Sequence, residues 1–255
     1  MTALAEALGP AETVAAVLGV YLLAGMVKGA MGFGLPIVSV ALLPFVVPVT
    51  QALTLNAIVL LATNIAQVWR AGDRRGGLAA AWPLMLGMAL TVLPAAWAAA
   101  AIPREALLLV LGVFVMAFVG WSLAAAQIRI APRAVQPVGV ATGMAAGVVG
   151  AITSAPGAVF VAYVVALGLS RPAHMAALGY IMGLFGLMLT GSYAAVGLMR
   201  WEDVPLGLLS VPAAIAGMAL GDGWAKGLGD TRFRREVLAL LAVLGLLLIR
   251  RALSS

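Results

Sequence analysis

Charged residues divide this 255-residue chain into long apolar runs, without the regular polar faces of a soluble protein. Five runs contain no Asp, Glu, Lys or Arg: residues 29–69, 76–103, 106–128, 134–170 and 172–199. A transmembrane helix needs only about 20 consecutive apolar residues. The runs 29–69 and 134–170 must therefore each hold two segments.

Splitting the chain at charges, prolines and glycines predicts ten apolar segments. They are residues 11–27, 29–48, 50–69, 78–101, 105–126, 137–152, 154–169, 173–198, 204–225 and 233–251. The segments that flank the two glycine motifs described below are short. Each of these two pairs of segments fits either two tilted helices or a re-entrant hairpin of half-helices. Both options use an even number of crossings, so they leave the orientation of the other helices unchanged.

Composition supports an all-α polytopic membrane protein. Hydrophobic residues make up 64% of the chain and charged residues 9%, and the mean hydropathy is +1.13. Soluble domains contain about 45–50% apolar and about 25% charged residues. The chain has no cysteine, which excludes disulfides, thiolate catalysis and iron–sulfur chemistry.

Basic residues gather in four loops that fall on the same side of the predicted membrane. They are Arg70, Arg74, Arg75, Arg129, Arg133, Arg171, Lys226, Arg232, Arg234 and Arg235. The positive-inside rule places these loops in the cytoplasm and the N-terminus outside. Arg104 and the segment 200–203 then lie outside. Arg250 and Arg251 oppose this scheme, because ten crossings put the C-terminus outside as well.

A glycine motif occurs twice in corresponding parts of the chain. Its copies are Gly25, Gly29, Gly32, Gly34, Pro36 and Gly143, Gly147, Gly150, Pro156, Gly157. The first three glycines of the second copy each follow those of the first by 118 residues. Five segments per half is an odd number, which predicts two inverted repeats with broken or re-entrant helices at the repeat interface. The predicted division is 1–126 for the first membrane repeat, 127–136 for a cytoplasmic linker and 137–255 for the second repeat.

Glycine beside proline inside a membrane is typical of a helix break that faces protein, water or a ligand. The freed N–H groups form an anion site without a basic side chain, and glycine lets a ligand approach the backbone. The candidate binding residues are Gly32, Phe33, Gly34, Leu35, Pro36, Gly150, Thr153, Ser154, Pro156 and Gly157. By contrast, the four-residue spacing of Gly25 with Gly29, and of Gly143 with Gly147, favours close helix packing.

Lys28 is the only charged residue within the first motif. It either attracts the anion or extends to the membrane surface. Asn56 and Asn64 lie about two turns apart on one helix face, which either bounds a polar pathway or makes interhelical hydrogen bonds. His174 and Asp222 are weaker candidates for proton coupling.

These residues resemble a known family. The run from Gly25 to Gly34, continuing into Pro36 and the Thr54 to Asn56 helix, is similar to the first motif of the sulfite exporter TauE/SafE family. Residues 143–157 resemble its second-half counterpart, although 151–156 depart from the glycine cluster usual there, which implies an altered ligand preference. The resemblance implies a bacterial inner-membrane permease that moves small sulfur-containing or carboxylate anions, often outward.

The sequence therefore predicts a secondary transporter that exports small anions such as sulfite or organosulfonates. The alternatives are a carrier for another small solute, such as a carboxylate or a cation, an intramembrane enzyme, or an accessory subunit. The enzyme is disfavoured by one histidine and no acidic pair inside a segment. The expected partners are a small anionic substrate and the lipid bilayer, with a homodimer as an option; no nucleic acid, cofactor or metal is expected.

Overall fold

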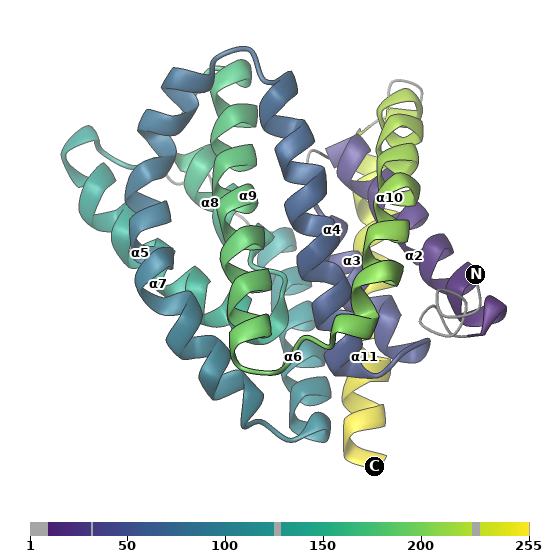
Figure 1. Ribbon diagram of the computed structural model, residues 1–255. Coiled ribbons are helices and arrows are strands. Elements are labelled where there is room, and N and C mark those ends of the chain that lie inside the picture. The colour runs from purple at the N-terminus through teal and green to yellow at the C-terminus, as the bar shows by residue number, and fades with distance from the viewer. Residues whose placement is uncertain (1–9, 32, 125–128, 226–229, 255) are drawn as a thin grey trace. The chain divides into compact units, whose positions relative to one another are not determined.

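The computed structural model describes residues 10–31, 33–124, 129–225 and 230–254, and within these ranges the chain is helical, without strands (Figure 1). The helices are α2 (Ala11–Met31), α3 (Leu35–Leu42), α4 (Val49–Arg70), α5 (Arg74–Ala100), α6 (Arg104–Ala124), α7 (Val135–Thr153), α8 (Gly157–Ala166), α9 (Arg171–Ala195), α10 (Val204–Ala225) and α11 (Asp230–Ser254). The described ranges also contain three short 3-10 segments. They are η1 (Leu43–Phe45), which follows α3, η2 (Pro132–Ala134), which precedes α7, and η3 (Trp201–Asp203), which precedes α10.

Eight of the described helices are long and apolar enough to cross a membrane, and α3 and α8 are shorter. The ten predicted segments therefore each correspond to a helix. At 1.5 Å per residue, the ten residues of α8 span about 15 Å, roughly half of the hydrocarbon thickness. The chain is a multi-pass membrane protein.

The chain forms two compact units, which we describe separately. Unit 1 contains Met1–Val59, Ile102–Ala125 and Met199–Ser255, and unit 2 contains Leu60–Ala101 and Ala126–Leu198. Each unit thus takes helices from both halves of the sequence. This is a different division of the chain from the two predicted repeats, which remain a prediction.

In unit 1, α2 and α10 lie side by side and run in the same direction (Figure 1). Their backbones approach so closely that no side chain fits between them. A Cβ on Gly25 or Gly29 would overlap the carbonyl oxygen of Ala214 or Met218. A Cβ on Gly217 or Gly221 would likewise overlap Leu22 O or Met26 O.

In unit 2, α5 packs against α7 in the same way. A Cβ on Gly143 would overlap Leu84 O, and one on Gly87 would overlap Val140 O. Gly147 faces Thr91, whose hydroxyl donates to Met144 O at 3.1 Å. Close packing is therefore confirmed for the glycines of both motifs that are spaced by four residues.

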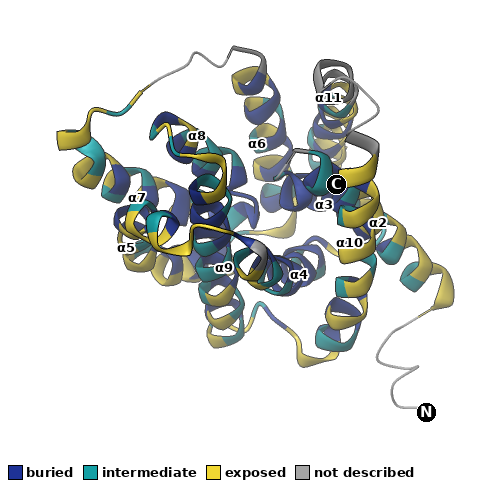
Figure 2. Ribbon diagram, turned by 90° about the horizontal axis from the view of Figure 1, so that it is seen from above, coloured by how far each residue is buried: buried dark blue, intermediate teal, exposed yellow. Residues whose placement is uncertain are grey.

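The outer faces of the helices are apolar and exposed (Figure 2). Large side chains that are more than half exposed occur on several long helices. Examples are Trp69, Leu90, Trp97, Leu187, Leu208 and Leu220. A soluble monomer rarely exposes apolar patches of this extent, whereas a bilayer provides an apolar solvent for them.

We predict that Gly29→Leu lowers the stability of the purified protein, because its side chain would meet the α10 backbone. The expected loss is about 1–3 kcal/mol or more. The measurement is thermal unfolding in detergent, followed by tryptophan fluorescence. Gly19→Leu is the matched control in the same helix, since nothing lies within 4 Å of its Cβ position. Equal melting temperatures for the two variants would contradict the close approach.

Candidate functional site

The first candidate for a broken helix is the connection between α2 and α3 in unit 1, which we call the first break. Gly34 adopts a left-handed conformation with φ of 108°, and a Cβ there would lie 2.9 Å from Val27 Cγ1. Helix α3 begins at Leu35 with Pro36 in its first turn, as the sequence predicted. Phe33 is half-buried in the connecting segment, and Gly32 lies outside the described residues.

Lys28 lies in the last turn of α2, directly before this break. Its side chain is only 2% exposed. Lysine is rarely buried to this extent unless its charge has a function or a partner. The burial argues against the alternative in which the side chain extends to the surface.

Asn56 faces the same break from α4. Its Oδ1 accepts a hydrogen bond from the hydroxyl of Ser39 at 2.6 Å, and both side chains are fully buried. The Ser39 hydroxyl also lies 2.9 Å from Leu35 O and 3.0 Å from Pro36 O. The Ser39 hydroxyl therefore links α4 to the first turn of the short helix α3. Sequence reasoning missed Ser39, although it is the one polar residue of α3.

The second break lies between α7 and α8 in unit 2. Ser154 has φ of 58° and is the one residue other than glycine with a positive φ in the described ranges. Its N–H donates to Gly150 O at 2.6 Å, and the Thr153 hydroxyl donates to Val149 O at 2.8 Å. Thr153 Oγ1 also accepts from the N–H of Ala155 at 3.3 Å. These bonds satisfy backbone groups that the break would otherwise leave without partners.

The two glycines of this second break differ in the space around them. A Cβ on Gly150 would come within 2.6 Å of the Phe185 ring and 2.8 Å of Pro156, so Gly150 is needed for packing. A Cβ on Gly157, the first residue of α8, would meet only Met182 Cε, at 3.5 Å. Gly157 therefore leaves space at the start of α8, whereas Gly150 does not.

Three aromatic side chains surround the second break. The Tyr193 hydroxyl donates to Ala151 O at 2.6 Å, and the rings of Phe160 and Phe185 meet edge to face with centroids 5.6 Å apart. The sequence did not mark Tyr193 as a binding candidate. Its long-range partner could not be deduced, because the two residues are 42 positions apart.

The other polar candidates lie on α4, α9 and α10. Asn64 is in unit 2, where its side-chain amide donates to Leu60 O at 2.6 Å. His174 is partly buried in the first turn of α9, and Asp222 is exposed near the end of α10. The role of each in coupling stays a prediction.

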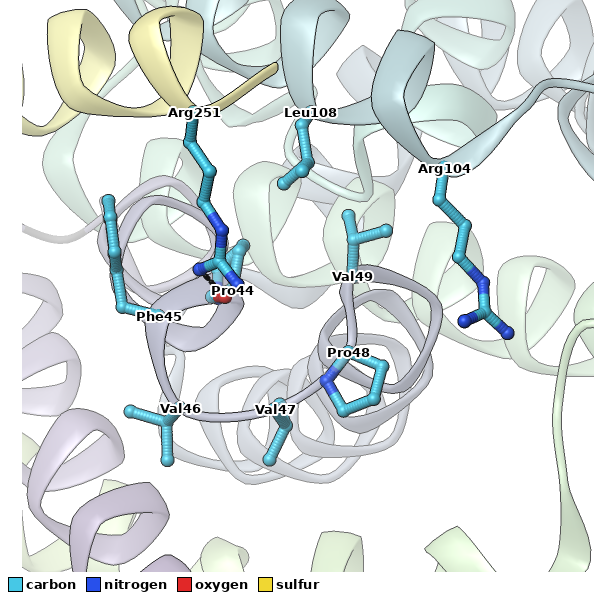
Figure 3. Close-up of a pocket in the computed structure, with 9 residues that line it drawn as sticks. All are labelled: Pro44, Phe45, Val46, Val47, Pro48, Val49, Arg104, Leu108 and Arg251. Carbon is cyan, nitrogen blue, oxygen red and sulfur yellow. Dashed lines mark hydrogen bonds between the residues drawn. The ribbon is translucent and has the colours of Figure 1, made fainter. Parts of the chain in front are cut away.

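Unit 1 also contains a pocket of about 410 Å³ beside the segment that joins α3 to α4 (Figure 3). Arg251 reaches from α11 and donates from Nη1 to Pro44 O at 2.7 Å, with its guanidinium 5.8 Å from the centroid of the Phe45 ring. Arg104 lies at the other side of the pocket. The C-terminal arginine that opposed the charge pattern thus holds a connecting segment of its own unit.

The comparison with known families identifies the chain. A family model described as "Sulfite exporter TauE/SafE" matches residues 17–248. The chain belongs to the TauE/SafE family. It is therefore a membrane transporter of the permease type, and the resemblance seen in the glycine motifs is confirmed. Neither the curated proteins nor the solved structures compared with the chain give a match.

We predict that Ser154→Val destabilises this TauE/SafE protein, whereas Ser154→Gly is tolerated. A β-branched residue at a positive φ is a genuine outlier, and such strain costs about 1–3 kcal/mol. Thermal unfolding of both variants in detergent measures the difference. A Ser154→Val protein as stable as Ser154→Gly would contradict the left-handed conformation.

Proposed function

We propose that this TauE/SafE protein is a secondary carrier of small anions, with sulfite and organosulfonates as the favoured substrates and export as the favoured direction. The burial of Lys28 beside a helix break carries the proposal. An ammonium held away from water is stabilised by the negative end of the α2 dipole, and an arriving anion would neutralise it further. The family membership agrees with this chemistry.

The proposed binding residues of unit 1 are Lys28, Gly32, Phe33, Gly34, Pro36 and Asn56, to which the structure adds Ser39. The Ser39 hydroxyl contacts Asn56 and the carbonyls of the first turn of α3, whose N–H groups carry the positive end of a helix dipole. The proposed residues of unit 2 are Thr153, Ser154, Pro156 and Gly157, with Gly150 as a packing support. Gly157 has no Cβ, so an anion could approach the N–H groups at the start of α8 closely, as an anion site at a helix N-terminus requires.

The contacts of the long helices support an inverted repeat. Residues of α7 follow their counterparts in α2 by 118 positions, and residues of α5 precede their counterparts in α10 by 130 positions. Under this correspondence, the contact of Gly25 with Ala214 O matches that of Gly143 with Leu84 O. The contact of Gly217 with Leu22 O matches that of Gly87 with Val140 O. Two pairs of helices with one packing pattern are expected from a duplicated sequence.

The breaks also correspond. Gly34 precedes Pro36 by two positions, and Ser154 precedes Pro156 by two positions, and both residues have a positive φ. Breaks at equivalent places in two halves are the feature that locates substrate sites in transporters built from repeats. We therefore propose that α2 with α3, and α7 with α8, are the broken helices of the two repeats.

Export is favoured by the membrane potential. For a monovalent anion that leaves a cell with a negative interior, the field contributes about 2.3 kcal/mol per 100 mV, which by itself supports an outside-to-inside concentration ratio of about fifty. The positive-inside rule favours a cytoplasmic position for the loops 70–75, 129–133 and 171, and the bacterial inner membrane is the proposed location. A homodimer stays an expectation, which crosslinking in native membranes would test.

Flux measurements in proteoliposomes test the proposal. Labelled sulfite, a small organosulfonate and a small carboxylate are compared, with the membrane potential clamped at two values. Saturable anion flux that follows the potential is the expected result. Carboxylate flux without sulfite or sulfonate flux would favour the alternative substrate class. Flux of a cation, with none of the three anions transported, would overturn the anion proposal.

We predict that Lys28→Met raises the KM for the transported anion at least about tenfold, which corresponds to about 1.4 kcal/mol. The methionine retains most of the apolar side chain but removes the charge. Lys28→Arg is the matched control, since it keeps the charge. An unchanged KM for Lys28→Met, with a normal elution profile in detergent, would remove Lys28 from the binding site.

We predict that Gly157→Leu abolishes transport while the protein stays folded, because the side chain fills the space at the start of α8. Gly157→Ala is the control and retains transport, since its Cβ meets only the flexible end of Met182. Gly34 gives a less clear test. Its positive φ and the nearby Val27 make any substitution there destabilising as well. Normal transport by Gly157→Leu would show that ligands do not approach α8.

A further inference from the structure

Asp203 is the one buried acidic side chain in the ranges whose burial the structure describes. It lies at the end of η3, directly before α10, and is 4% exposed. Its Oδ1 accepts a hydrogen bond from Gln51 Nε2 at 2.7 Å. Its Oδ2 is buried and has no hydrogen-bond partner among the described residues. A carboxylate oxygen in this state is costly to keep charged.

The corresponding residue of the first half behaves differently. Asp73 precedes α5 and lies 130 positions before Asp203, the same offset that relates the packing residues of α5 and α10. Asp73 is exposed, and its Oδ1 accepts from the N–H of Gly76 at 2.9 Å, as the N-cap of α5. The carboxylate of Asp203 is instead directed to Gln51 on α4. Helix capping therefore accounts for the position of the Asp73 carboxylate, but it does not account for the burial of Asp203.

The charged groups around Asp203 do not neutralise it fully. Arg200 is close enough to act on the carboxylate electrostatically, but its guanidinium pairs with Glu202, and both of those side chains are exposed. The first turns of α4 and α10 carry no other titratable side chain. On α2, which packs parallel to α10, Glu12 lies level with the start of α10 and is exposed.

The charged side chains of Arg200 and Glu202 beside Asp203 are exposed, and charged groups favour water over lipid. Trp201 and Glu202, which directly precede Asp203, are both exposed. A proton from water could therefore reach the carboxylate by a short path. The carboxylate itself is held in a fixed orientation by Gln51.

We propose that Asp203 is a proton-binding site that couples anion transport to the proton gradient. A proton from water binds to Oδ2, which forms an O–H bond, and the same proton later leaves that oxygen for water. Gln51 positions the carboxylate through Oδ1 and leaves Oδ2 for the proton. The coupling role rests on the proposed transport function, whereas proton binding itself does not.

A proton fits this site better than a metal cation. Hard metal cations take about six or more oxygen ligands. The described part of the chain contains no group of three His, Cys, Asp or Glu side chains that could hold a metal ion. One buried carboxylate oxygen is enough for a proton.

Infrared spectroscopy of the purified protein tests proton binding without any transported substrate. The spectrum at acidic pH minus that at neutral pH contains the carbonyl band of each carboxyl group that becomes protonated. We expect a band that is present in the wild type and in Asp73→Asn but absent from Asp203→Asn. Gln51→Leu should move the pH midpoint of that band. Identical bands in the wild type and Asp203→Asn would overturn the proposal.

Transport in proteoliposomes tests the coupling. With the potential clamped, an imposed pH gradient should change anion flux in the wild type and in Asp73→Asn, but not in Asp203→Asn. Anion exchange at equal pH on both sides should persist in Asp203→Asn. Coupling is overturned if Asp203→Asn keeps the wild-type response, if it also loses exchange, or if the wild type responds only to a sodium gradient. Absence of any wild-type anion flux would count against the carrier proposal, while the infrared result still decides proton binding.

Discussion

The structure depends on one constraint: in a membrane, the backbone polar groups at a helix break must be satisfied within the protein or by a ligand. At the first break, the hydroxyl of Ser39 meets the carbonyls of the opening turn of α3 and the side-chain oxygen of Asn56. At the second break, Ser154 N–H, the Thr153 hydroxyl and the Tyr193 hydroxyl serve Gly150 O, Val149 O and Ala151 O. The breaks are therefore ordered features with assigned partners, and only specific side chains at these positions permit them.

The glycines provide the rigid frame in which these breaks can exist. Where α2 meets α10, and where α5 meets α7, backbone lies directly against backbone. In lipid, helix association is driven by such packing, because the apolar surroundings give no hydrophobic preference for one surface. One set of glycines thus fixes the long helices and another makes the breaks. Gly150 belongs to both sets, since it accepts the Ser154 bond and also accommodates Phe185.

The sequence predicted the features that depend on local composition. Apolar runs located the helices, and glycine with proline marked the connections between α2 and α3 and between α7 and α8, because membrane length and backbone freedom are local properties. The features that depend on tertiary contacts were not predictable. Ser39 bonds to Asn56 on another helix, Ser154 has a conformation more usual for glycine, and Gln51 meets Asp203 across 152 positions. Asp222, near the end of α10, was the acidic candidate, yet it is exposed, whereas Asp203, directly before α10, is buried.

Lys28 and Asp203, the two buried charged residues among those described in unit 1, are too far apart to touch each other. Lys28 precedes Gly29, which meets Met218, and Met218 follows Asp203 by fifteen residues, or about 22 Å along α10. At this separation, protonation of Asp203 would affect an anion near Lys28 mainly through the helices that carry the two groups. Because α2 and α10 touch backbone to backbone at four glycines, a displacement of one helix must move the other. If α10 moves when Asp203 changes charge, the packing of α2 on α10 would transmit the effect of the proton to the anion near Lys28.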